Sequence, residues 1–180
     1  SSATSQHATT FAPTGSVQGT TSLRPSIAFA QGLGLSINEK GTKAAAIAVR
    51  TDAVGGLKHY DLATVDLQKG TTTVFRTDGV EEASPVLIDD ETVAIATTLR
   101  NGQRELARVD LTNGERRSFG RIFDGPFAAL PSGEVVVGHR AAQGAIRLDA
   151  VANDGASRVL GVLPRHTRPV AVDRFATRAE

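Results

Sequence analysis

The sequence predicts an all-β protein made of β-propeller blades, each with four short antiparallel strands, with about three complete blades and a partial blade at each end. Two observations support this prediction. A strand-and-turn segment returns along the chain at a period of roughly 44 residues, which is typical of propeller blades. The composition, with 18 Gly and no Trp or Met, is typical of a turn-rich fold with a core of Val, Ile, Leu and Ala.

The repeat is clearest in a strand that is followed by a turn. Residues 63–70, ATVDLQKG, return as residues 107–114, ARVDLTNG, and a less regular copy at residues 148–155 reads LDAVANDG. In the first two copies apolar and polar residues alternate, so a strand places the apolar side chains on one face. The dipeptide Asn113-Gly114 predicts a type I′ hairpin turn, in which both central residues have positive φ.

Three further strands complete each predicted unit. The strand before each copy ends in an arginine, at Arg50, Arg100 and Arg140. Another β-rich strand follows each copy, and an apolar strand with a polar turn opens each unit. The opening strands are expected at Leu33 to Ile37, Pro85 to Ile88 and Phe127 to Leu130, their turns at residues 38–41, 89–91 and 131–133, and the outer strands at residues 72–76, 116–120 and 157–161.

These units divide the chain into two parts. Residues 1–25, rich in Ser and Thr, are expected to form a polar tail or the last hairpin of a preceding blade. Residues 26–180 are expected to form a partial propeller. Its blades are expected at residues about 31–82, 83–125 and 126–166, with the start of the next blade at 167–180.

Closed propellers have about four to eight blades, so the remaining blades are expected outside this chain, on a partner chain or on a second copy. The alternative is an irregular β-sandwich.

The units resemble the blades of TolB-like and prolyl-oligopeptidase-type propellers. The residues that carry the resemblance are Leu106 to Glu115, their echo at Leu62 to Gly70, and the turn Pro131-Ser132-Gly133. The resemblance implies a propeller. It does not imply one activity, because such blades occur in peptidases, periplasmic binding modules and lipoproteins.

Charge and composition exclude several classes of function. The chain has 20 Lys and Arg against 19 Asp and Glu, and this net charge of +1 is too small to favour binding to nucleic acid or to an anionic membrane. The absence of Cys excludes disulfides, thiolate metal sites and a cysteine nucleophile. Neither a Gly-x-Ser-x-Gly pentapeptide nor a phosphate-binding loop is present. We therefore expect no catalytic residue, metal site or cofactor in this chain. We also expect a soluble protein, and a secreted or periplasmic location is favoured.

An acidic pair and a basic group are the candidate substrate-binding residues. Glu81 and Glu82 are expected between an outer strand and the next inner strand, near one rim of the ring. Some dipeptidyl peptidases related to the family that these blades resemble hold a substrate's amino terminus with a Glu pair, and carboxylates bind ammonium by charge-assisted hydrogen bonds. The alternative is a solvated polar loop.

His139, Arg140 and Arg168 are expected at the ends or starts of inner strands, where they can converge on the channel and bind an anion. The favoured alternative is that the recurring arginines pair with Asp from a neighbouring blade.

The favoured function is a non-catalytic propeller segment that binds protein or peptide, or that gates access to a serine hydrolase (peptidase) domain outside this chain. One alternative is a propeller enzyme of the metal-dependent lactonase type. It requires convergent Glu, Asp and Asn at the channel, whereas the opening strands are almost wholly apolar. The other alternative is a purely structural assembly module that associates through open strand edges.

Overall fold

The computed structural model describes residues 6–11, 17–23, 27–30, 32–51, 56–77, 79–121 and 124–164. Strands make up nearly all regular structure in these residues, with one short 3-10 turn at Ala142–Gly144. Strands β1 (Gln6–Phe11) and β2 (Val17–Leu23) pair with each other as an antiparallel hairpin. In the described part of the chain, no helix is long and apolar enough to span a membrane.

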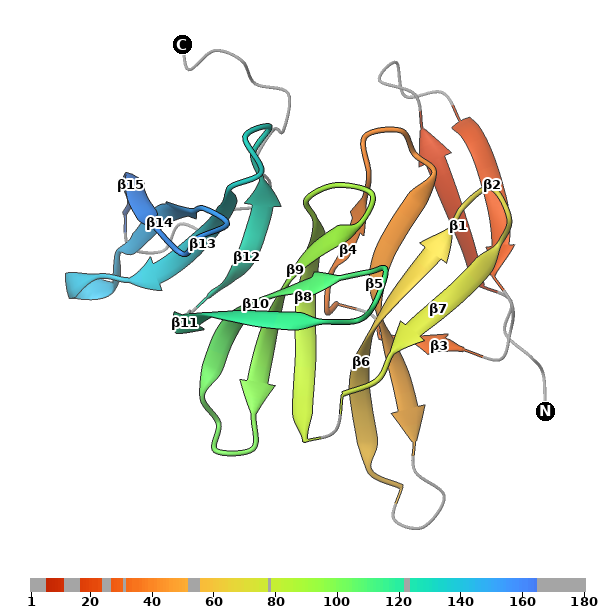
Figure 1. Ribbon diagram of the computed structural model, residues 1–180, viewed down its shortest axis with the longest axis horizontal. Coiled ribbons are helices and arrows are strands. Elements are labelled where there is room, and N and C mark those ends of the chain that lie inside the picture. Colours follow the sequence, from red (N-terminus) through yellow and green to blue (C-terminus); the bar gives the residue numbers. More distant parts are fainter. Residues whose placement is uncertain are drawn as a thin grey trace.

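The remaining strands form three antiparallel sheets, which we call blades 1, 2 and 3 (Figure 1). Blade 1 contains β3 (Ala28–Phe29) and β4 (Leu35–Ile37), which both pair with β5 (Lys43–Thr51), followed by β6 (Lys58–Asp66) and β7 (Thr71–Phe75). Blade 2 contains β8 (Val80–Leu87), β9 (Thr92–Leu99), β10 (Arg104–Asp110) and β11 (Arg116–Arg121). Blade 3 contains β12 (Asp124–Ala129), β13 (Val135–Arg140), β14 (Ile146–Val151) and β15 (Ser157–Leu163).

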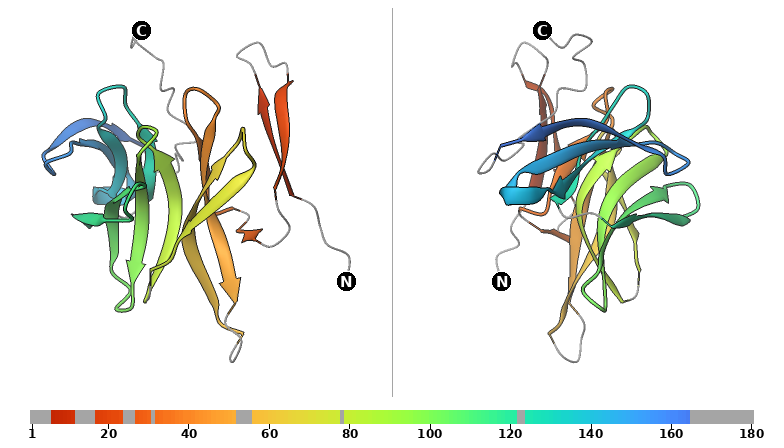
Figure 2. Two further views of the ribbon diagram at one scale, coloured as in Figure 1. Left: turned by 45° about the vertical axis from the view of Figure 1, so that its right-hand side comes forward. Right: turned by 90° about the vertical axis from the view of Figure 1, so that its left-hand side faces the viewer.

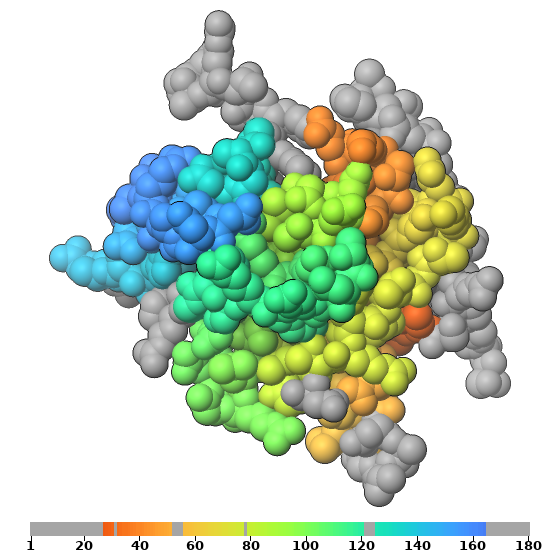
Figure 3. Space-filling view, viewed as in Figure 1, coloured from red at the N-terminus to blue at the C-terminus, as the bar shows by residue number. Residues whose placement is uncertain are grey.

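The three blades follow one another in space in the order of the sequence. Figures 2 and 3 show them as successive bodies, from orange and yellow through green to blue. In each blade, strands that are adjacent in sequence pair with each other, except that β3 and β4 both pair with β5. The predicted all-β fold of four-stranded propeller blades is therefore confirmed, and a two-sheet sandwich is not what the chain forms.

The core consists of apolar layers between consecutive blades. Val93 and Ile95 of β9 pack toward blade 1, against residues such as Ile47 and Leu62. The alternate residues of β9, Ala94 and Ala96, pack against Leu106 and the blade 3 residues Val135 and Val137 in a second layer. Blade 2 thus buries both faces, because each has a neighbouring blade.

The inner strand is divided in blade 1 and pairs irregularly in blades 2 and 3. In blade 1 the strand β4 begins only at Leu35, so the predicted opening strand from Leu33 to Ile37 is shorter than expected. In β8 the ladder is irregular between Ala83 and Val86, where Ser84 has a φ of 53°. The Ser84 N–H donates to the Leu33 carbonyl at 2.6 Å, and a Cβ on Gly34 would lie only 3.0 Å from Ser84 Cα. These irregularities let the inner strands of blades 1 and 2 approach closely.

The repeated Val-Asp-Leu segment forms an aspartate-capped turn. Asp110 Oδ1 accepts hydrogen bonds from the Thr112 N–H at 2.7 Å and the Thr112 hydroxyl at 2.6 Å, and the Gly114 N–H donates to the Asp110 carbonyl. Asp66 Oδ1 caps the equivalent turn in blade 1. Gly114 has a φ of 77°, but Asn113 does not have positive φ. The predicted type I′ turn is therefore wrong, because the turn is longer and only its glycine takes the left-handed conformation.

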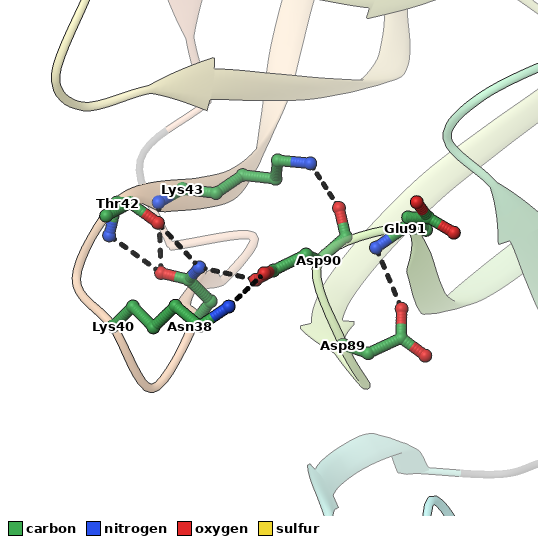
Figure 4. A network of polar contacts seen from close by, with 7 residues as sticks. All are labelled: Asn38, Lys40, Thr42, Lys43, Asp89, Asp90 and Glu91. Carbon is green, nitrogen blue, oxygen red and sulfur yellow. Dashed lines mark hydrogen bonds and ion pairs between the residues drawn. The ribbon is translucent and has the colours of Figure 1, made fainter.

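A polar network joins the first turns of blades 1 and 2 (Figure 4). The Asn38 side-chain N–H donates to Asp90 Oδ1 at 2.7 Å, and Lys40 Nζ lies 2.8 Å from Asp90 Oδ2. Asn38 also accepts the backbone N–H groups of Thr42 and Lys43. Hydrogen bonds from Lys40 and Asn38 lower the pKa of Asp90. The network ties the two blades together at one rim.

Candidate functional site

Two neighbouring hollows lie at the junction of blades 1 and 2, and we call them together the interblade groove. The first hollow has a volume of about 490 Å³ and is lined by Phe29, Ala30, Leu33, Val49, Lys58, Tyr60, Glu81, Glu82, Ala83 and Thr98. The second has a volume of about 440 Å³ and is lined by Leu57, Lys58, His59, Gly79, Val80, Glu81, Thr98, Leu99, Arg100 and Gly102. Lys58, Glu81 and Thr98 line both hollows, so the two hollows adjoin each other.

The groove lies at the rim opposite the Asn38–Asp90 network. Lys58 stands at the start of β6 and Glu81 near the start of β8, whereas Asp90 follows the end of β8. In Figure 1 the end of β5 and the start of β8 lie together at the lower side. The groove is thus built from strand ends of two blades, which the antiparallel pairing brings to one rim.

Glu81 and Glu82 both lie within β8, so the prediction that they occupy a junction between strands is wrong. Because successive side chains of a strand point to opposite faces, Glu81 is exposed while Glu82 is only 1% exposed. The Glu82 carboxylate accepts the Leu62 N–H of blade 1 and forms an ion pair with Arg116 of β11. Burial raises the pKa of Glu82, and the nearby Arg116 opposes this effect. The two carboxylates therefore do different things: Glu82 is buried and joins the blades, and Glu81 is exposed in the lining of the groove.

The first hollow combines apolar walls with charged groups at its edge. Phe29, Leu33 and Tyr60 supply large apolar surfaces, and each also packs on an apolar core cluster. Glu81 and Lys58 are the exposed charged groups of its lining. Such a hollow can hold an apolar side chain and orient it by a few polar contacts.

Arginine and glycine shape the second hollow. A Cβ atom on Gly79 would lie 2.4 Å from Arg100 Nε, and Gly79 has a φ of 78°. The guanidinium therefore packs directly over a backbone that only glycine can supply. Lys58 and His59, at the start of β6, bring two further basic side chains to this hollow.

The predicted basic site is only partly described. His139 Nε2 lies 3.2 Å from Asp149 Oδ2, and Arg147 lies 2.7 Å from the same oxygen. Arg140 is exposed at the end of β13, and Arg168 lies outside the described residues. Neither His139 nor Arg140 lines the interblade groove, so anion binding by this group stays a prediction. In the described ranges, no three His, Asp or Glu side chains lie together in a way that could hold a metal ion.

The recurring arginines do not share one role. Arg50 lies 3.2 Å from Asp61 within blade 1, so the prediction that it pairs with Asp of a neighbouring blade is wrong. The arginine that bridges blades 2 and 3 is Arg108, which sequence reasoning missed. It donates to Asn153 Oδ1 and, at 3.1 Å, to the Gly133 carbonyl. The signal in the sequence was the position of Arg108 in a strand of alternating apolar and polar residues. Arg108 occupies one of the polar positions, and the packing of blade 3 on blade 2 buries it.

The fold defines a class of protein, the partial β-propeller. Solved structures similar to the chain include TolB from Acinetobacter baumannii (18% identity, TM-score 0.55, 71% of this chain and 31% of that chain). They also include the β-propeller domain of the Trilobed protease from Pyrococcus furiosus (7% identity, TM-score 0.57, covering 78% of this chain and 44% of that chain). A third is an acylaminoacyl peptidase (10% identity, TM-score 0.55, covering 78% of this chain and 26% of that chain).

The blades therefore have the fold of TolB-like and prolyl-peptidase-type propeller repeats, as the sequence resemblance implied. The chain spans less than half the length of each of these structures. No protein-family model matches the chain, and no curated protein is significantly similar to it in sequence.

Proposed function

We propose that this chain is a non-catalytic propeller segment that binds peptides in the interblade groove. The observation that carries the proposal is the groove itself, in which an apolar hollow of about 490 Å³ adjoins exposed charged side chains. This volume lies within the range of small-ligand sites, roughly 300 to 1,000 Å³. An apolar peptide side chain fits the hollow, while the peptide backbone follows the groove.

Glu81 and Glu82 take separate parts in this proposal. Glu81 is exposed in the lining of both hollows, so its carboxylate is available to accept hydrogen bonds from an ammonium or guanidinium group of the peptide. Glu82 is a positioning residue. By binding the Leu62 N–H and Arg116, it fixes β8 against β6, and these two strands form opposite walls of the groove.

We extend the proposal to a longer protein in which this segment accompanies a hydrolase domain. Two of the similar structures are a protease's β-propeller domain and an acylaminoacyl peptidase. Their fold similarity supports an association of such blades with peptidases, and this chain contains no Gly-x-Ser-x-Gly nucleophile motif of its own. The groove would then select the peptides that reach that domain.

A blocking substitution tests the proposal. Thr98 lines both hollows, so Thr98→Arg places a long side chain in the groove without removing a large core residue. A phage-displayed library of seven-residue peptides is selected on the wild-type chain, and enriched peptides are measured by fluorescence polarisation on both proteins. We expect Thr98→Arg to weaken their binding at least tenfold. The matched control is Thr73→Arg on the exposed outer strand β7, which leaves binding unchanged.

The outcome that overturns the proposal is equally concrete. If no peptide is enriched, or if enriched peptides bind the two arginine variants equally well, the groove is not a peptide site. Circular dichroism and the urea midpoint of both variants establish that loss of binding does not reflect loss of the fold.

A further inference from the structure

The second hollow of the groove has a different chemical character from the first, and this difference concerns the class of peptide that is bound. Among the described residues, the basic side chains of Lys58, His59 and Arg100 line it, together with the single carboxylate of Glu81. The inference rests on the proposed function: we propose that this hollow binds a carboxylate group of the peptide whose apolar side chain occupies the first hollow.

Lys58 and Arg100 are available for such a ligand. Both residues are exposed, and among the described residues neither forms an ion pair with a carboxylate. They come from different blades, Lys58 from the start of β6 and Arg100 from the residue that follows β9. A carboxylate between them would therefore be held from two sides.

The backbone at Gly79 holds the arginine of this pair in place. Arg100 Nε and the guanidinium carbon lie where a Cβ of residue 79 would otherwise stand, at 2.4 and 3.0 Å from that position. The exposed side chain of Arg100 therefore has its guanidinium packed against the backbone at Gly79. A guanidinium is planar and can donate two parallel hydrogen bonds to a carboxylate, so a fixed plane favours this anion.

The position of Glu81 limits the possible occupants. An isolated anion near Glu81, which lines both hollows, would be repelled by its carboxylate, whereas Arg100 lines the second hollow alone. A peptide can place an apolar side chain, a backbone and a carboxylate along the groove in turn. The carboxylate comes from the peptide's own C-terminus or from an Asp or Glu side chain.

Four fluorescein-labelled peptides with one apolar sequence, taken from the library selection, test the inference. The first ends in a free carboxylate and the second in a carboxamide. The third and fourth are carboxamides in which the last residue is Glu or Gln. Fluorescence polarisation gives each dissociation constant. We expect either the free acid or the Glu peptide to bind about 5- to 10-fold more tightly than its neutral counterpart, with the difference decreasing at high salt.

Substitutions assign that preference to the hollow. Arg100→Gln should reduce the carboxylate preference to less than twofold, and Lys58→Gln should reduce it partly. Lys69→Gln is the matched control, because Lys69 is an exposed basic residue in the turn after β6, at the opposite end of that strand. It should leave the preference unchanged.

Each outcome has a separate meaning. A preference for the free acid alone identifies the peptide C-terminus, and a preference for Glu alone identifies an acidic side chain. Equal binding of acid and neutral peptides, with loss of binding in Thr98→Arg, overturns the inference and leaves the proposed function standing. A carboxylate preference that survives the Arg100→Gln, Lys58→Gln double substitution also overturns it. Absence of binding by every peptide overturns both.

Discussion

The buried carboxylate of Glu82 is predicted to be a main tie between blades 1 and 2. Glu82→Ala removes the acceptor of the Leu62 N–H and the carboxylate that pairs with Arg116, at a residue that is only 1% exposed, and leaves Arg116 with the Phe75 carbonyl. Breaking a buried ion pair costs about 3 to 5 kcal/mol. The side chain of Arg116 is 21% exposed and can recover some hydration, so the lower end, about 3 kcal/mol, is expected.

Urea unfolding at pH 7, followed by far-UV circular dichroism, measures this cost. With a slope of about 2 kcal/mol per molar urea, the midpoint of Glu82→Ala should fall by about 1.5 M. Glu82→Gln keeps an acceptor for the Leu62 N–H and should lose only about 1 to 2 kcal/mol. Glu81→Ala, on the exposed face of the same strand, is the control and should stay within about 0.5 kcal/mol of wild type. Equal midpoints for Glu81→Ala and Glu82→Ala would refute the reasoning.

The raised pKa of Glu82 adds a pH signature. Burial raises this pKa above its ordinary value of 4.5, so the folded chain binds the proton more tightly than the unfolded chain does. The contribution of Glu82 to the free energy of unfolding is therefore largest below pH 4.5 and falls as the pH rises from 4.5 to the folded pKa. Glu82→Gln should remove this part of the pH dependence. A wild-type profile that rises through this window by the same amount as the variant's profile would contradict the assignment.

Three further predictions concern other contacts. Arg108→Met, which removes the bridge from β10 to blade 3, should cost about 2 kcal/mol in urea unfolding, and an unchanged midpoint would show that the bridge contributes nothing. Gly79→Val should displace Arg100 and strain a residue with a φ of 78°, lowering thermal stability and abolishing the carboxylate preference, whereas retention of both would contradict the packing. The hydrogen bonds from Arg158 lower the pKa of Glu134 to about 2, so the small stabilisation from this exposed pair should be present above pH 4.5 and lost as the pH falls toward 2. Glu134→Gln should remove this loss in acid urea unfolding, and an unaltered acid profile would refute the assignment.

The strands of the blades were predictable because their signals are local. β13 coincides with the predicted strand that ends at Arg140, and β11 begins at the predicted Arg116. Alternating apolar residues and turn glycines repeat in each blade, and from β5 to β7, β8 to β11 and β12 to β15 neighbouring strands in the chain are also neighbours in the sheet. Antiparallel pairing of adjacent segments needs little beyond these local preferences.

The candidate site was predicted less well, because its properties depend on contacts between blades. Two adjacent glutamates look equivalent in the sequence, yet β8 begins early enough to include both, and its alternation buries Glu82 and leaves Glu81 exposed. Arg100 was recognised only as a strand-ending arginine. Its position over Gly79 depends on how the connection into blade 2 passes beside the end of β9.

The sequence by itself determined that this chain forms repeated four-stranded blades, since hydrophobic alternation, turn chemistry and the repeat are properties of short segments. Only the tertiary structure decided which face of each strand a neighbouring blade covers. That choice buried Glu82 and Arg108, left Glu81 and Arg100 exposed in one groove, and brought Lys58 to the same rim. The physical reason is that burial and charge pairing between blades arise from residues about 20 to 45 positions apart, whose proximity no local pattern specifies.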